Sequence, residues 1–181
     1  YKRQADGLIA VASGAGGHAG TLSPLALVQE IREWFDGPLL LSGAIATGDS
    51  VLAAQAMGAD LGYIGSAFIA TDEANADERY KLSIVDGSAN DIIYSNLFTG
   101  VHGNYLRNSI EAAGLDPENL PESDPSKMDF GDGSSKAWKD IWGSGQGTGA
   151  VKKIGPAADL IARLKQEYSA ARQRMEALPW K

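Results

Sequence analysis

One of the two histidines in the 181-residue sequence, His18, lies in a glycine-rich stretch, SGAGGHAG, directly after a short apolar run. An unperturbed imidazole has a pKa of about 6.5, so His18 is suited to proton transfer near neutral pH. The surrounding glycines leave room for a flat ligand to approach both the backbone and the imidazole. We expect a loop rather than a helix or strand here. A catalytic role for His18 and a purely structural one both remain open.

Two further glycine-rich turns follow, SGAIATGD at residues 42–49 and YIGSAF at residues 63–68. Exposed backbone N–H groups next to the start of a helix can bind phosphate without a lysine. We therefore expect the two turns together to cradle a dianionic phosphate. Each turn taken alone is equally explained as a tight connection between a strand and a helix.

The remaining polar residues offer fewer chemical options. His102 lies among apolar and aromatic residues in FTGVHGNYL, which indicates a buried or lid-packing side chain. The acidic residues between positions 72 and 78 predict a solvated helix start. The sequence contains no cysteine, so it has no disulfide, thiolate nucleophile or cysteine metal ligand, and two histidines argue against a histidine-rich zinc site. No G-x-S-x-G elbow surrounds Ser13 or Ser66, and the acidic residue that a nicotinamide-binding motif needs is missing.

Composition limits the partners. A net charge of −7 with 16 Lys and Arg residues, none of them in a basic run, disfavours nucleic acid and anionic membrane surfaces. No apolar stretch reaches the roughly 20 residues that span a bilayer, and YKRQADG at the N-terminus lacks the apolar core of a signal peptide. We expect a cytoplasmic protein without nucleic-acid or membrane partners.

Three segments repeat one order of elements: an apolar strand, a glycine-rich turn and a helix. Strands are expected at residues 7–13, 38–42 and 61–65, and helices at residues 25–35, 50–58 and 75–84. Asp49 or Ser50 is the expected N-cap of the second helix, and Gly58 its end. This alternation predicts a parallel sheet covered on both faces, with all three turns at the carboxyl edge of the strands, where α/β proteins bind ligands.

Beyond residue 85 the repeated order is lost. We expect a short helix at residues 105–114, a polar loop at 114–135, a helical turn at 137–142, and one long amphipathic helix at 156–177 that packs outside the preceding units. A second glycine-rich segment, WGSGQGTGA, lies before the long helix. The chain thus divides into residues 1–85, with the phosphate site, and residues 86–181, a mainly helical and loop region that completes the rim of the site.

Together the turns resemble the FMN-dependent nitronate monooxygenase family, also called 2-nitropropane dioxygenases. That family's AGGH-x-G, AGGIA-x-G and GAD-x-x-x-x-GT-x-F motifs correspond, in the same order, to AGGHAG, SGAIATG and GADLGYIGSAF. The match covers residues 6–72 well, and GVHGNYL, WKDIWGSGQGTGA and the final helix extend it over nearly the whole chain.

The resemblance implies roles for individual residues. His18 is the catalytic base or the hydrogen-bond partner of the substrate nitro group, Gly16 lies against the flavin, and Gln146 borders the flavin or the substrate. The FMN phosphate is bound mainly through backbone N–H groups of Ser42, Gly43, Ala44, Tyr63, Ile64, Gly65 and Ser66. Ala44 replaces a family glycine and Ser66 a family threonine, but both keep the backbone donor. No metal is implied.

The resemblance also implies an α/β fold, the C-terminal part of a (β/α)8 TIM-type barrel with about its last three strands, followed by a helical C-terminal region. The first five strands are expected from a missing N-terminal half, from another chain or from a homo-oligomer. The implied reaction converts a nitronate or nitroalkane and O₂ into a carbonyl compound and nitrite. Alternatives are a flavin-dependent enoyl-acyl-carrier-protein reductase or NAD(P)H:quinone reductase, and an inactive fragment that binds a phosphorylated ligand or a partner chain.

Overall fold

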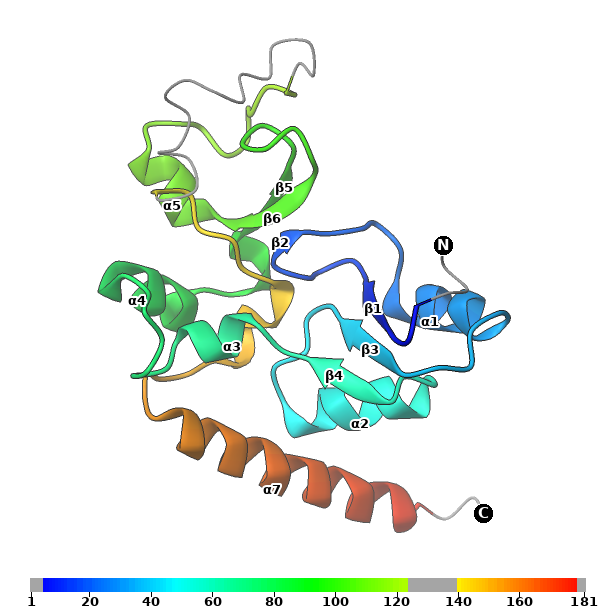
Figure 1. Ribbon diagram of the computed structural model, residues 1–181. Coiled ribbons are helices and arrows are strands. Elements are labelled where there is room, and N and C mark those ends of the chain that lie inside the picture. Colours follow the sequence, from blue (N-terminus) through cyan, green and yellow to red (C-terminus); the bar gives the residue numbers. More distant parts are fainter. Residues whose placement is uncertain (1–4, 124–139, 179–181) are drawn as a thin grey trace.

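Two three-stranded sheets organise the chain, one parallel and one antiparallel (Figure 1). The computed structural model describes residues 5–123 and 140–178. Its elements in chain order are β1 (Leu8–Val11), β2 (Gly17–His18), α1 (Pro24–Arg32), β3 (Leu39–Ser42), α2 (Gly48–Ala56), β4 (Leu61–Tyr63), α3 (Ser66–Ile69), α4 (Glu78–Asp86), η2 (Ala89–Asp91), β5 (Ile92–Ser95), β6 (Gly103–Leu106), α5 (Arg107–Ala112), η5 (Gln146–Ala150) and α7 (Ala157–Glu176).

The parallel sheet has the strand order β1–β3–β4, and its strands lie within the three ranges that the sequence predicts. Ala10 is in register with Leu41, and Leu41 with Gly62. Strands this short and apolar are stable only when a face is buried. Here α1 and α2 cover one face around Leu39, Leu41 and Val28, which are all fully buried.

The other face of this sheet is exposed, so the expectation of a sheet covered on both faces is wrong for this chain. Side chains alternate along a strand, and the outward row consists of Ile9, Val11, Leu61 and Tyr63, which are 41 to 55% exposed. Such large apolar side chains on one continuous face normally pack against something. In a closed barrel this face would be the interior.

Helix starts differ from the sequence expectations by a few residues because local hydrogen bonds decide them. The N-cap of α2 is Thr47, rather than Asp49 or Ser50, since its hydroxyl accepts the N–H of Ser50 in a reciprocal capping box. Gly58, with φ +111°, lies just after the helix as predicted. Helix α4 starts at Glu78, not at residue 75, because Asp77 is its cap.

A charged cluster ties the elements together at the amino end of the strands. The Arg32 guanidinium on α1 donates to the Gly58 carbonyl at 2.7 Å, to the Gly37 carbonyl at 2.8 Å and to the Asp60 carboxylate at 2.9 Å. Asp60 also accepts the backbone N–H of Leu39 at 2.7 Å. That backbone bond, followed by Arg32, lowers the pKa of Asp60 below its usual value.

The region after residue 85 contains strands that the sequence interpretation missed. Strands β5 and β6 form an antiparallel pair, and β2 joins β6 on its other side, giving the order β2–β6–β5. The segment around His18 is therefore partly strand, not only loop. The expected helix at residues 105–114 is shorter, since Tyr105 and Leu106 belong to β6 and α5 follows, ending before Gly114 with φ +79°.

Helix α7 matches the predicted long helix and packs on α2, as Figure 1 shows along the lower side of the molecule. The two helices approach so closely that a Cβ at Gly48 would collide with the backbone of Tyr168 and Leu164. None of the helices within the described residues is long and apolar enough to cross a membrane. Residues 137–139 of the expected turn at 137–142 lie outside the described residues.

Candidate functional site

The Gly14 carbonyl joins three glycine-rich segments that are distant in sequence. It accepts the Ala44 N–H at 3.2 Å and the Gln146 N–H at 2.9 Å. Gly14 has φ +81°, which favours glycine, and a Cβ there would lie 2.9 Å from the Gln146 side-chain oxygen. The turns after β1 and β3 therefore meet at the carboxyl edge of the sheet, as expected, and the segment that begins η5 meets them there.

These segments enclose a pocket of about 320 Å³, a size within the range of small-molecule sites. Most of the predicted site residues line it: Gly16, Ser42, Gly43, Ala44, Tyr63, Gly65 and Ser66. The other lining residues are Gly14, Ala15, Gly17, Ile45, Ala46, Ile69, Tyr80, Ile141, Trp142, Gly143, Gly145 and Gly147. Ile64 instead packs against the hydrophobic core, and Gln146 is exposed beside Gly14. No lysine, arginine or histidine is among the lining residues.

Backbone donors are concentrated where β4 leads into α3. Within the described part of the chain, the N–H groups of Gly65, Ser66 and Ala67 have no protein acceptor, as the first turn of a helix requires. The Ser66 hydroxyl oxygen accepts the Gly145 N–H at 2.9 Å, which leaves its own hydrogen to donate. The Ala44 N–H, by contrast, is used by the Gly14 carbonyl.

His18 lies beside this pocket, on β2, and its side chain is exposed. Its Nε2 is 2.9 Å from the Thr99 hydroxyl. The preceding residues Gly16 and Gly17 line the pocket, whereas His18 itself is not among the lining residues. His18 thus follows directly in sequence on the glycine turn that lines the pocket.

His102 is exposed, so the expectation that its side chain is buried is wrong. Its side chain is exposed and stacks on Tyr94, with ring centroids 5.0 Å apart. The Tyr94 hydroxyl in turn donates to the Ala19 carbonyl at 3.0 Å. His102 therefore helps to hold the chain next to His18.

Sequence reasoning missed the aromatic wall of the pocket. Tyr80 from α4 stacks on Trp142 with centroids 5.2 Å apart, and its hydroxyl donates to the Gly143 carbonyl. Burial raises the pKa of Tyr80 to about 12, so the phenol stays protonated at neutral pH and acts as a hydrogen-bond donor rather than a base. The only sequence signal was that aromatic residues adjoin the second glycine-rich segment.

Buried Asn104 on β6 is the other residue that sequence reasoning missed. Its side-chain amide donates to the Ala15 carbonyl at 2.6 Å, and its backbone carbonyl accepts the Ser144 N–H at 3.2 Å. One residue thus fixes the His18 turn and the glycine segment against the second sheet. A lone asparagine between a glycine and a tyrosine gives no sequence signal for this role.

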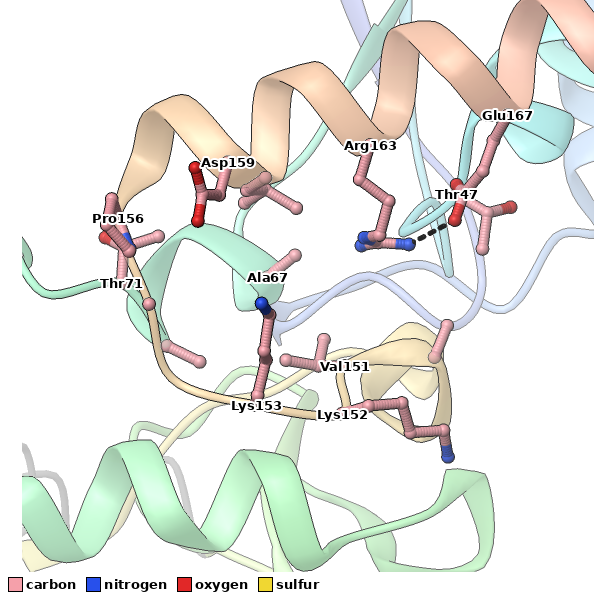
Figure 2. Close-up of a pocket in the computed structure, with 14 residues that line it drawn as sticks. Thr47, Ala67, Thr71, Val151, Lys152, Lys153, Pro156, Asp159, Arg163 and Glu167 are labelled. Carbon is pink, nitrogen blue, oxygen red and sulfur yellow. Dashed lines mark hydrogen bonds and ion pairs between the residues drawn. The ribbon is translucent and has the colours of Figure 1, made fainter.

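A second cavity, of about 550 Å³, lies between α3, α7 and the segment that follows η5 (Figure 2). Figure 2 shows Arg163 and Glu167 paired at its edge, with their charged atoms 2.6 Å apart. Glu167 also accepts the Gly48 N–H at 2.8 Å, and Arg163 donates to the Ala46 carbonyl at 3.2 Å. Both side chains thus bind the backbone of the turn after β3, which lines the first pocket.

Among the described residues no group of three or more histidine, aspartate or glutamate side chains is arranged to hold a metal ion. The chemistry available at the pocket is therefore that of backbone donors, glycine surfaces, one stacked aromatic pair and a nearby imidazole. Its place at the carboxyl edge of a parallel α/β sheet is where proteins of this class carry their small-molecule sites.

Comparison with known proteins gives the family. The model of the nitronate monooxygenase family matches residues 1–167, and the chain belongs to that family. It is 27% identical over 186 residues to nitronate monooxygenase of Paraburkholderia phytofirmans, covering 94% of this chain and 51% of that protein. The chain thus spans about half the length of this curated relative. The resemblance found in the sequence motifs is confirmed.

Solved structures agree with this assignment. Nitroalkane oxidase from Streptomyces ansochromogenes superposes with a TM-score of 0.75 at 27% identity, over 96% of this chain and 56% of that one. FabK from Thermotoga maritima superposes with a TM-score of 0.76 at 23% identity, over 96% and 57% of the two chains, and shows a shared fold. The α/β class predicted from the sequence is confirmed.

The backbone conformation of Ala44 leads to a prediction about the stability of the chain. Among the described residues it is the single non-glycine residue with positive φ, +55°, at the position where the family motif has glycine. We expect Ala44→Gly to raise the free energy of unfolding by about 1 kcal/mol, because the Cβ penalty of the left-handed conformation is removed. Urea unfolding of the chain measures it.

The matched control for Ala44 is Ala46→Gly in the same turn. Ala46 is buried and has no positive φ, so its loss of a methyl group should lower the free energy of unfolding by about 1 kcal/mol. Equal destabilisation by both substitutions would show that the left-handed backbone at Ala44 carries no strain.

Proposed function

We propose that this chain forms the FMN-binding and catalytic part of an oxidoreductase that oxidises nitronates or nitroalkanes with O₂. The observation that carries the proposal is the junction at the Gly14 carbonyl, because it brings the family's glycine turns to one pocket beside His18. Family membership supplies the chemistry, and the pocket supplies a place for it.

The residues present fit FMN. Its phosphate would lie at the N–H groups of Gly65 and Ser66, with the Ser66 hydroxyl as a further donor. A Cβ at Gly65 or Gly17 would meet no atom within 4 Å, so both glycines border open space. The flavin ring would lie along Gly16 and Gly17. The chemistry that FMN supplies when bound is electron transfer from the nitronate to O₂, which yields a carbonyl compound and nitrite.

The chain's own contribution to the reaction is proton removal and charge stabilisation. A neutral nitroalkane must lose the proton on the carbon that bears the nitro group, and the His18 imidazole is the base beside the pocket. The resulting nitronate is an anion, which the protonated imidazole would stabilise. Tyr80 and Trp142 exclude water from one side of the pocket.

The phosphate cradle is tested by FMN binding. Gly65→Val fills the open space at the first turn of α3, and because φ of Gly65 is −112° the substitution needs no left-handed backbone. We expect FMN affinity, followed by quenching of FMN fluorescence, to fall at least tenfold, about 1.4 kcal/mol. Riboflavin, which lacks the phosphate, should bind both forms with similar weak affinity.

Gly155→Val is the control for the FMN experiment. Gly155 likewise faces open space but lies outside the pocket. The control should keep the FMN affinity of the unsubstituted chain. Loss of affinity in both variants, or in neither, would argue against a phosphate site at Gly65.

The role of His18 is tested by comparing two substrates. We expect His18→Asn to lower nitrite release from a neutral nitroalkane by about two to four orders of magnitude, the usual range for a general base. Release from a preformed nitronate should change much less, because that substrate has already lost its proton. Equal losses on both would make His18 a binding residue, and bleaching of bound flavin by NADH alone would favour the reductase alternative.

We also propose that further strands continue the parallel sheet at its edges and close a barrel, with the exposed face as its interior. Both edge strands, β1 and β4, are open on their outer side within the described chain, and the row from Ile9 to Tyr63 is apolar. Solved relatives that share the fold are nearly twice as long as the matched part, since the chain covers 56% and 57% of them. Strands from outside residues 1–181 are the occupant that suits this face.

The exposed face predicts binding of the apolar dye ANS by the isolated chain. Leu61→Lys, on strand β4 of this face, should lower the dye fluorescence to roughly half or less, because a charge interrupts the apolar row. Met175→Lys, at an exposed position of α7, is the control and should leave it unchanged. Absence of dye binding together with a dimer in sedimentation would assign the face to a second copy of this chain.

A further inference from the structure

The second cavity shares three of its walls with the first pocket. Along α3, Ser66 lines the first pocket and Ala67 the second. The turn after β3 is divided in the same way, since Ala46 lines the first pocket and Thr47 the second. Helix η5 also contributes residues to both. The same three segments of backbone therefore border two separate spaces.

These shared walls are packed tightly against one another. A Cβ at Gly147 would lie 2.9 Å from the Ala44 carbonyl oxygen, so η5 and the turn after β3 are in direct contact. The Gly145 N–H donates to the Ser66 hydroxyl at 2.9 Å, which joins the start of η5 to α3. In a close-packed interior, a displacement of one wall is passed on to its neighbours. A ligand in the second cavity would thus act on the backbone that lines the first pocket.

One side of the second cavity is apolar. Ala67, Ala70 and Val151 are buried there, and Leu160 from α7 packs on the same hydrophobic cluster. The volume of about 550 Å³ is within the range of sites for small molecules. An aliphatic chain placed against these residues would lose contact with water, which favours its binding.

Lys153 brings an unpaired positive charge into this cavity. Figure 2 shows its side chain extending into the cavity from the segment after η5, whereas that of Lys152 points away. Within the described part of the chain, the Lys153 ammonium group has no hydrogen bond or ion pair. The Arg163 and Glu167 side chains neutralise each other, so Asp159 on α7 supplies the remaining negative charge of the lining.

A buried ammonium group adds positive potential at one end of the cavity. Lys81 on α4 is 6% exposed, and its Nζ donates to the carbonyl of Thr71, a lining residue, at 2.8 Å. Buried charges are normally paired, but among the described residues no carboxylate forms an ion pair with Lys81. The Glu73 carboxylate instead accepts the Ala157 N–H at 2.9 Å. An anion in the cavity would supply the missing negative charge.

We propose that the second cavity binds a small carboxylate with an aliphatic chain, and that its occupation tightens ligand binding in the first pocket. The carboxylate group lies at Lys153, and the chain lies along Ala67, Ala70 and Val151. Ordering of the shared walls by one ligand lowers the entropic cost of binding the other, and this effect is reciprocal. The coupling to FMN rests on the proposed function, but the carboxylate site does not.

Octanoate, a straight-chain carboxylate, is the probe for the site, and calorimetric titration of the whole chain measures its affinity. We expect octanoate to bind. Octylamine, which has the opposite charge on the same length of chain, and inorganic phosphate, which has no chain, should not bind. Absence of octanoate binding, or equal binding of octylamine, would overturn the proposal.

A pair of charge reversals locates the bound octanoate. Lys153→Glu should lower its affinity about tenfold, because an attraction is replaced by a repulsion. Lys165→Glu makes the same charge change at an exposed position of α7 outside the cavity, so it should keep the affinity. Octanoate that bound to the exposed apolar face of the parallel sheet would respond to neither substitution, and that outcome would contradict the proposal.

The coupling is measured as FMN affinity, by fluorescence quenching, with and without saturating octanoate. We expect octanoate to raise FMN affinity about fivefold, at the lower end of couplings between sites, and Lys153→Glu to remove this effect without changing FMN affinity in the absence of octanoate. Unchanged FMN affinity, or a fall that Lys153→Glu does not relieve, overturns the coupling. Absence of FMN binding while octanoate still binds overturns the proposed function and leaves the carboxylate site standing.

Discussion

A single backbone oxygen, the Gly14 carbonyl, is the point on which the pocket depends. It receives N–H groups from residues 44 and 146, so three turns separated by up to 132 positions share one acceptor, as 146 − 14 = 132. The left-handed backbone of Gly14 turns this carbonyl toward both donors. The bond from Gly145 to Ser66 and the bond from Asn104 to Ala15 then fix the neighbouring segments. The candidate site is thereby held by main-chain hydrogen bonds and by two short side chains, which are less free to rearrange than long ones.

None of the described residues that line the pocket is basic, so an anion bound there would be held by backbone N–H groups. Lys152, Lys153 and Arg163 line the other cavity, behind the turn that follows β3. Recognition by N–H groups depends on the direction of fixed dipoles, so it selects the shape of a ligand as well as its charge. The arrangement accords with a net charge of −7, which would repel anions that lacked such a site.

Periodicity in the sequence predicts the elements whose side chains repeat over several turns. The three strand–turn–helix units and α7 are of this kind, and so the carboxyl-edge turns could be placed from the sequence. The strands β2, β5 and β6 are two to four residues long and contain glycine, asparagine and serine, so no alternation distinguishes them from loops. The site was predicted where glycine turns mark it. It was missed at Tyr80 and Trp142, whose stacking joins residues that are far apart in the sequence.

The bond between Glu167 and the N–H of Gly48 connects α7 to the turn that lines the pocket. The same short segment, Ala44 to Gly48, has the pocket on one side and α7 on the other. A ligand that ordered this segment would draw on the same conformational entropy as the packing of the helix, so binding in the pocket and attachment of the helix would each reduce the cost of the other. This link would hold although the helix contributes no atom to the pocket wall.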